Sequence, residues 1–337
     1  MLPIADKTRE LEGVDPRALP ETLLTATQPV VLRGLIADWP LVKAGLRSAQ
    51  AAREYLLGFY AQATVGAFLG GPEIHGRFSY NDDLTGLNFR PVKIKLDTVL
   101  DEILRHESAV NPPALYVGST TIDTCLPGLR ADNDLGFGGY SPLASIWIGN
   151  RARISAHHDL PDNLACVAVG HRRFTLFPPD EVANLYIGPI DFTPAGQPIS
   201  LVDFAQPDFA RFPKFADALR RAQVAELGPG DAIFIPSLWW HHIESLDSLN
   251  TLVNYWWRQS PSYMDTPVNA LLHAIMTVRD LPAEQRKACE ALFQHYVFDA
   301  SEETAAHIPA NARKVLAPMT EESVRELRAY LLRRLNR

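Results

Sequence analysis

Cysteine is scarce in this chain of 337 residues, and its three copies lie far apart. Cys125, Cys166 and Cys289 form no CxxC pair, so the sequence offers neither a disulfide framework nor a cysteine-based zinc site. Proteins of reducing compartments typically use cysteine in this way. We therefore expect a cytoplasmic location.

Long apolar runs and an excess of basic charge are also missing. No stretch approaches the roughly 18 apolar residues that a membrane-spanning helix needs, and the first ten residues lack the apolar segment of a secretion signal. The formal net charge is −7, whereas general nucleic-acid binders carry a basic field. The sequence thus predicts neither a membrane nor a nucleic acid as a partner.

The remaining composition is that of an ordinary globular protein with a large core, since 47% of the residues are hydrophobic and 21% are charged. Residues 1–113 mix helical and strand-like patterns. Residues 114–260 hold short β-rich runs separated by Gly, Pro, Asn and Asp, with a long Pro- and Asp-rich insertion at 178–223. Residues 261–337 are helical again. We expect a mostly β fold, a barrel or sandwich with flanking helices.

Local patterns place the individual elements. Ser48 and Thr320 are candidate N-caps, and Thr320 begins the last helix. Pro40 closes a turn after the first strand. The expected helices span 16–25, 48–60 and 95–106, and the expected strands span 29–34, 63–69, 114–118, 145–148, 155–159, 163–177, 231–236 and 250–258. The C-terminal helices would pack on the barrel or pair with a second subunit.

Three residues have the pattern of a metal site. His157 and Asp159 are two apart, and on an extended strand this spacing sends both side chains to the same face. A tight turn at 228–231 precedes a buried strand, 232–236, that leads to His241. Two imidazoles and one carboxylate that leave other positions open are typical of non-haem Fe(II) oxygenases. We therefore predict that these three residues bind one metal ion.

Several motifs resemble those of the JmjC/cupin-8 group of oxygenases, and they are closest to the asparaginyl hydroxylase of the hypoxia pathway. These motifs are Leu176-Phe-Pro-Pro-Asp180, Val202-Asp-Phe204, Arg211-Phe-Pro213, Gly228-Pro-Gly-Asp231, Trp239-Trp-His-His-Ile-Glu-Ser245 and Val253-Asn-Tyr-Trp256. The resemblance implies a double-stranded β-helix (jelly-roll, cupin/JmjC) core, Fe(II), and 2-oxoglutarate as cosubstrate. It also implies His157, Asp159 and His241 as the metal ligands, with His158 and His242 as second choices that face away.

By the same resemblance, Arg172 takes the position of a lysine that binds the far carboxylate of 2-oxoglutarate. Arginine can bind a carboxylate through two hydrogen bonds. If Phe174 and Leu176 point inward, alternation puts Arg172 inward and Arg173 outward. Ile154 replaces a threonine that contacts the same carboxylate. Because Arg172 and Ile154 both differ from the residues of that group, the protein could use a different cosubstrate or could have lost catalysis.

Four further residues match positions around the cosubstrate or the metal in that group. Tyr116 would reach the cosubstrate, although it could equally be a core aromatic residue. Asn163 would lie near the metal, and Asn254 and Trp256, on one strand face, would line the site. A buried asparagine must find hydrogen-bond partners, because an unpaired amide costs about 1–3 kcal/mol.

We therefore expect a 2-oxoglutarate-dependent Fe(II) dioxygenase that uses O2 to hydroxylate a polypeptide side chain, held in a groove flanked by the insertion at 178–223. Demethylation is the less favoured outcome, and a small-molecule substrate remains open. The alternatives are a different metal-dependent cupin enzyme that does not use 2-oxoglutarate, and a non-catalytic sensor. The resemblance also implies a homodimer formed through the C-terminal helices.

Overall fold

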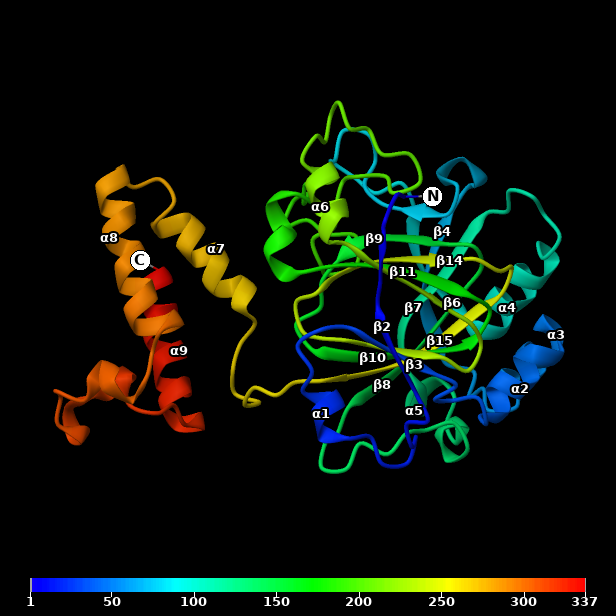
Figure 1. The fold of residues 1–337 in the computed structure, drawn as a ribbon, viewed down its shortest axis with the longest axis horizontal. Coiled ribbons are helices and arrows are strands. Elements are labelled where there is room, and N and C mark those ends of the chain that lie inside the picture. The colour runs from blue at the N-terminus through cyan, green and yellow to red at the C-terminus, as the bar shows by residue number, and fades with distance from the viewer. Residues whose placement is uncertain (1, 337) are drawn as a thin grey trace. The chain divides into compact units, whose positions relative to one another are not determined.

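The computed structural model describes residues 2–336, and the chain divides into two compact units between Arg258 and Gln259. Two β-sheets stacked face to face form the first unit (Figure 1). The six-stranded sheet contains, in spatial order, β1 (Asp6–Lys7), β12 (Gln223–Leu227), β11 (Arg172–Phe177), β14 (Trp240–Ser245), β9 (Arg153–His157) and β5 (Arg77–Phe78). The nine-stranded sheet contains β2 (Arg9–Glu12), β3 (Val30–Arg33), β13 (Ala232–Ile235), β10 (Asp162–Val169), β15 (Asn250–Trp257), β8 (Leu143–Gly149), β7 (Ala114–Thr121), β4 (Thr64–Gly70) and β6 (Arg90–Lys95).

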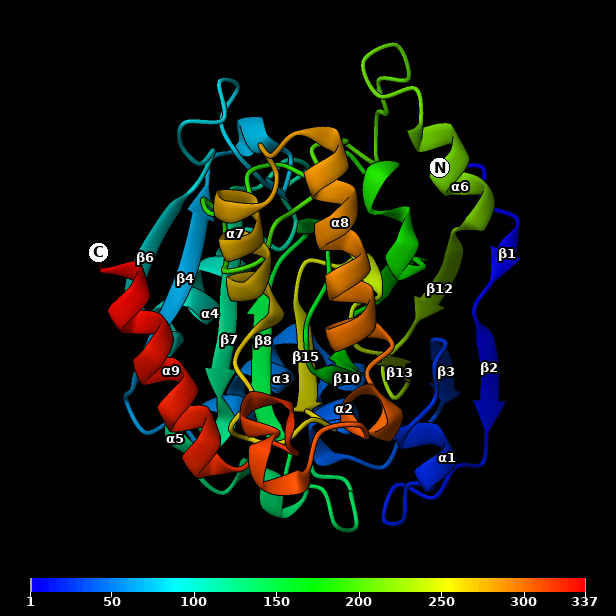
Figure 2. The same ribbon diagram turned by 90° about the vertical axis from the view of Figure 1, so that its left-hand side faces the viewer.

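Eight of these strands make a jelly roll. Strands β8, β15, β10 and β13 form the centre of one sheet, and β9, β14, β11 and β12 pair antiparallel in the other. The chain passes from one sheet to the other between most successive strands, as expected for a double-stranded β-helix. Figure 2 shows β7, β8, β15 and β10 side by side. The predicted fold class is confirmed.

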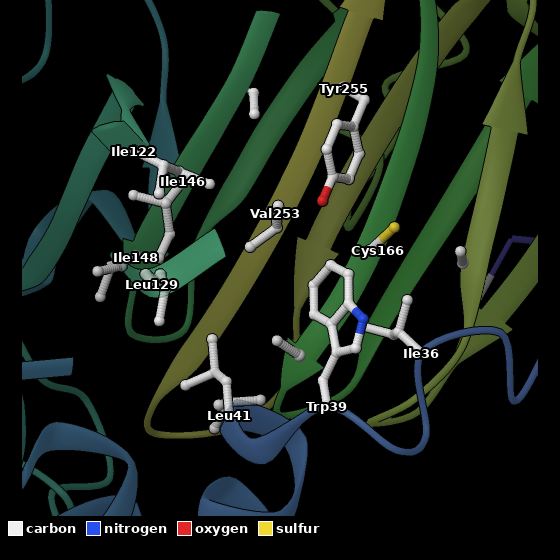
Figure 3. Packing of buried hydrophobic residues seen from close by; sticks show 14 of the residues in the cluster. Ile36, Trp39, Leu41, Ile122, Leu129, Ile146, Ile148, Cys166, Val253 and Tyr255 are labelled. Carbon is white, nitrogen blue, oxygen red and sulfur yellow. The ribbon is translucent and has the colours of Figure 1, made fainter. Parts of the chain in front are cut away.

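Helices cover the outer face of the nine-stranded sheet. They are α1 (Glu21–Leu24), α2 (Pro40–Arg47), α3 (Ala49–Leu57), α4 (Leu96–Arg105) and α5 (Ile122–Cys125), and α6 (Phe215–Arg221) lies in the 178–223 insertion. Ser48 caps α3, because its hydroxyl accepts a hydrogen bond from the Ala51 amide at 3.0 Å. Alternate residues of the strands, among them Ile146, Val253 and Tyr255, belong to one apolar cluster with Trp39, the N-cap residue of α2 (Figure 3).

The opposite faces of the same strands point between the two sheets. A second core of apolar side chains fills one end of this interior, with Val167 and Leu252 from one sheet facing Phe174 and Leu176 from the other. The other end stays open and contains the histidines described below. Burial on both faces explains why these strands read as nearly continuous apolar runs.

The structure corrects three expectations about local structure. Residues 163–177 are two strands, β10 and β11, which lie in different sheets; Gly170 has φ of +76° and allows the chain to turn between them. The helix expected at 16–25 is reduced to α1. Pro40 starts helix α2, because the fixed φ of proline suits the first helical position.

The second unit, residues 259–336 of the described chain, is helical. It contains α7 (Pro267–Thr277), α8 (Ala283–Phe293), a π-helical turn at Gln294–Phe298 and α9 (Glu321–Leu335). As predicted, Thr320 caps α9 by accepting a hydrogen bond from the Ser323 amide. Within the span 2–336, no helix has the length and apolar character that crossing a bilayer requires.

Candidate metal centre and cosubstrate cavity

Two adjacent strands and one connection bring the predicted metal ligands together. His157 ends β9 and pairs directly with His241 on β14, so their rings lie 4.3 Å apart between centroids. Asp159 lies two residues beyond the end of β9, not on the strand as predicted. The ligand atoms of all three residues nevertheless lie within 4.8 Å of one another, and His241 Nε2 is 3.7 Å from Asp159 Oδ2. This set has the composition of a facial metal site.

Backbone carbonyls fix the orientation of both imidazoles. His157 Nδ1 lies 2.9 Å from the Ser155 carbonyl oxygen, and His241 Nδ1 lies 2.9 Å from that of Trp239. A carbonyl oxygen only accepts, so each Nδ1 carries the proton and each Nε2 keeps a free lone pair. Metal-binding histidines are typically held in this way. Burial lowers the pKa of His241 well below its usual value, which keeps this ligand neutral.

The buried position of Asp159 disfavours its charged form when no cation is bound. Burial raises the pKa of its carboxyl, although the positive charge that His157 and His158 can carry and the Trp256 indole N–H act in the opposite direction. A desolvated carboxylate beside two imidazoles whose Nε2 atoms keep free lone pairs is suited to a cation. The donor types and their arrangement therefore fit a divalent metal ion.

The two neighbouring histidines face away from this centre. The His158 ring packs edge-on against Trp240 at 4.5 Å between centroids, and the His242 ring packs against Phe204 at 4.4 Å. Neither belongs to the ligand group. Burial lowers the pKa of His242 to about 3, so it is a neutral packing residue in the folded protein.

A cavity of about 420 Å³ opens beside the three ligands. The five other residues predicted for the site line this cavity together with the ligands; they are Tyr116, Asn163, Arg172, Asn254 and Trp256. Pro194, Ala195 and Gln197 of the 178–223 insertion also contribute to the lining. The cavity therefore adjoins the metal ligands, the candidate cosubstrate residues and part of the insertion.

Arg172 is the most unusual residue of the cavity. Its side chain is 1% exposed, and neither Nε nor one terminal nitrogen of the guanidinium has a hydrogen-bond partner among the described residues. Tyr116 lies against the guanidinium, and burial lowers the arginine pKa. A buried cation without a counter-charge is strongly unfavourable. This arrangement is complementary to an anion that enters the cavity.

The neighbouring Arg173, unlike Arg172, has carboxylate partners. It points to the outer face of the six-stranded sheet, where it forms ion pairs with Glu226 at 2.8 Å and Glu244 at 3.3 Å. Glu226, Asp191 and Asp203 do not line the cavity, and Asp203 instead pairs with Arg153 at 2.7 Å. Asp159 is thus the only carboxylate among the residues that line this cavity in the described chain.

A chain of hydrogen bonds runs along the inner face of the nine-stranded sheet. The Trp147 indole N–H donates to Asn254 Oδ1 at 2.8 Å, and Asn254 Nδ2 donates to Asn163 Oδ1 at 3.3 Å. Trp147 was not identified from the sequence. Its position could have been predicted, because Trp147 and Ser145 share one face of β8, whose other face is apolar.

Aromatic residues from the N-terminal region were also missed. Phe68 of β4, Phe78 of β5 and Phe89 line the cavity near Tyr116, with ring centroids 4.8–6.4 Å apart. Ile154 lies in the same lining. These side chains make an apolar wall, which lowers the local dielectric and strengthens any electrostatic contact to Arg172.

Comparison with known proteins agrees with this architecture. Residues 16–263 match the family described as a cupin-like domain. HSPB1-associated protein 1 of Rattus norvegicus is 35% identical over 274 residues, which cover 75% of this chain and 53% of that protein. Lysine-specific demethylase 8 of Xenopus tropicalis is 28% identical over 237 residues, which cover 69% of this chain and 49% of that protein.

Another relative, lysine-specific demethylase JMJ31 of Arabidopsis thaliana, is 35% identical over 132 residues, which cover 37% of this chain and 24% of that protein. The chain therefore spans from a quarter to about half the length of these curated relatives. The family match extends over most of the sequence, including every residue of the metal centre and the cavity. The chain belongs to the cupin-like, JmjC-type family.

Proposed function

We propose that the protein is an Fe(II)- and 2-oxoglutarate-dependent oxygenase that hydroxylates a polypeptide side chain. One observation carries this proposal: a buried guanidinium with unpaired N–H groups shares a cavity of about 420 Å³ with two histidines and an aspartate arranged for a metal ion. A dicarboxylate that binds Arg172 at one end and a metal ion at the other would satisfy both groups.

The residues divide the work by their chemistry. His157, Asp159 and His241 would hold Fe(II), and Arg172 with Tyr116 would bind the far carboxylate of 2-oxoglutarate. Asn163, Asn254 and Trp256 would offer donors to acceptor atoms in the cavity. When bound, Fe(II) and 2-oxoglutarate supply the oxidation, in which O2 is consumed, 2-oxoglutarate becomes succinate and CO2, and a substrate C–H bond gains an oxygen atom.

The substrate proposal rests on the cavity and on the relatives. Two of the matched proteins are named as lysine-specific demethylases, which supports a polypeptide substrate. Pro194, Ala195 and Gln197 of the insertion would contact it where the cavity opens. Because no described cysteine forms a disulfide, we also propose a cytoplasmic location.

The test measures succinate formed from 2-oxoglutarate by protein loaded anaerobically with Fe(II) and then exposed to air. We expect slow turnover without substrate in the wild type and none in His157→Ala. Binding of 2-oxoglutarate without turnover across a peptide panel would favour the sensor alternative. Absence of both binding and turnover in the metal-loaded protein would favour a different cupin enzyme.

We further propose that the C-terminal helices form a homodimer. Large apolar side chains on α7 to α9 are exposed, including Met276 at 65% and Leu335 at 51%, and Ala305 is the only buried apolar residue described in this unit. A unit with so small a core of its own gains stability by burying this surface against a second copy. Light scattering should report a dimer that Leu331→Glu dissociates and that Val110→Glu, an exposed position in the first unit, leaves intact.

A further inference from the structure

Two connections between the sheets lie beside the metal ligands. Residues 158–161 join β9 to β10 and carry Asp159, and residues 236–239 join β13 to β14 and lead directly into His241. Strand pairing fixes His157 and His241, because they face each other in the six-stranded sheet. Asp159 has no such support, because β9 ends at His157.

Hydrogen bonds from the second connection hold the first. The Leu238 amide donates to the Asp159 carbonyl oxygen at 2.8 Å. The Ser237 amide donates to Asp162 Oδ1 at 2.9 Å, and the Ser237 hydroxyl donates to the Leu160 carbonyl oxygen at 2.5 Å. The second connection is therefore bonded to the first at Asp159 and Leu160, and to the first residue of β10 at Asp162.

The backbone of the second connection is strained at this place. Leu238 has φ of +66°, a left-handed conformation that is unfavourable for leucine, and its side chain is 40% exposed. Packing of the side chain therefore gives little reason for the conformation. The hydrogen bonds that Ser237 and Leu238 donate give a reason for the left-handed conformation, because they form with the backbone in this conformation.

We propose that Ser237 is a positioning residue of the metal centre: its amide and hydroxyl hold the connection that carries Asp159, so that the carboxylate stays within reach of His157 and His241. This inference rests on the proposed function, in which the three residues share one ion. A ligand that is already in place loses less conformational freedom when the ion binds, and the affinity is correspondingly higher.

The experiment compares metal affinity in four variants by competition with a chelator, with Mn(II) as the probe. Ser237→Ala loses the hydroxyl and should bind Mn(II) about three- to tenfold more weakly. Ser237→Thr keeps the hydroxyl and should stay within about twofold of the wild type. Tyr60→Phe is the control, because it removes another hydroxyl outside the cavity lining, one that donates to the Ala63 carbonyl oxygen at 2.7 Å and accepts from the Leu96 amide at 3.0 Å.

Asp162→Asn weakens the same contact from the opposite side, and should also lower Mn(II) affinity while circular dichroism shows a folded protein. Unchanged affinity in both Ser237→Ala and Asp162→Asn would overturn the inference. So would an equal loss in Tyr60→Phe, since the effect would then be one of general stability. A wild type that binds no Mn(II) would instead contradict the proposed function itself.

Discussion

The Trp147 indole N–H donates to Asn254 Oδ1 at 2.8 Å, and this contact determines how the Asn254 amide faces the cavity. An indole nitrogen only donates, so the amide must turn its oxygen toward Trp147 and its NH2 group toward Asn163. The Asn254 oxygen is thereby occupied, and one N–H of its NH2 group donates to Asn163, so the group left for the cavity is the second N–H, a donor. With Arg172, this makes the inner face of the cavity rich in donors, as the proposed anionic cosubstrate would require.

Trp147→Phe should therefore weaken 2-oxoglutarate binding. The phenyl ring can keep the packing against Tyr116 and Trp256, whose rings lie 5.9 and 5.7 Å away, but it cannot hold the amide. We expect affinity for 2-oxoglutarate to fall about three- to tenfold by calorimetry with the Mn(II)-loaded protein, while Mn(II) affinity stays the same. If Trp147 acts through Asn254, the same substitution in an Asn254→Ala background will have no further effect.

Arg172→Ala should spare the metal and remove most of the cosubstrate affinity. Charge-assisted hydrogen bonds contribute about 1.5–3 kcal/mol, which predicts a loss of about 10- to 100-fold in calorimetric affinity for 2-oxoglutarate. Arg172→Lys keeps the charge but not the planar fork, so an intermediate value is expected. Arg173→Ala is the control, because its ion pairs lie on the outer face of the sheet. Undiminished affinity in Arg172→Ala would refute the role of this residue.

The burial of Arg172 also affects the free energy of unfolding of the ligand-free protein. In the absence of an anion, Arg172 is a buried charge with unpaired N–H groups, which costs free energy in the folded state. Arg172→Leu should therefore leave the ligand-free protein at least as stable as the wild type in urea unfolding, despite the change in a core strand. A loss of more than about 2 kcal/mol would show that the arginine has a structural partner after all.

His242 should make the protein sensitive to acid. Its pKa is about 3 in the folded state, below the usual value near 6.5, so the unfolded chain binds a proton that the folded chain rejects. The stability associated with neutral His242 is complete above about pH 6.5 and is lost as pH falls toward 3, by up to about 4 kcal/mol. Urea unfolding of the metal-free protein should show a shallower decline in His242→Leu. The exposed His75→Asn should follow the wild type.

The sequence predicted the chemistry of the centre better than its local structure. His157, Asp159 and His241 were predicted from their donor types and spacing, whereas Arg172 was predicted from the family resemblance, with alternation only separating it from Arg173. The same alternation rule placed Asp159 on a strand that in fact ends two residues earlier. The connection that carries Asp159 is held by Ser237 and Leu238, which are distant in sequence and leave no periodic signal.

Local sequence patterns also did not predict which sheet each strand belongs to. Residues 163–177 were read as one strand, yet Gly170 divides them between two sheets. Likewise, β13 and β14 belong to different sheets, although the sequence suggested one strand leading straight to His241. The face of Trp147 could have been read from the alternation of β8, but its hydrogen bond to Asn254, 107 positions later in the chain, could not. Such contacts arise from the crossovers of the jelly roll and not from neighbouring residues.

Metal content is the most direct test of whether His157, Asp159 and His241 bind one ion. Wild-type and His241→Ala proteins would be loaded anaerobically with Fe(II), freed of excess metal by gel filtration and analysed for iron. We predict a single iron per wild-type chain and essentially none in a folded His241→Ala protein. Equal iron in both proteins, or none in the wild type, would contradict it.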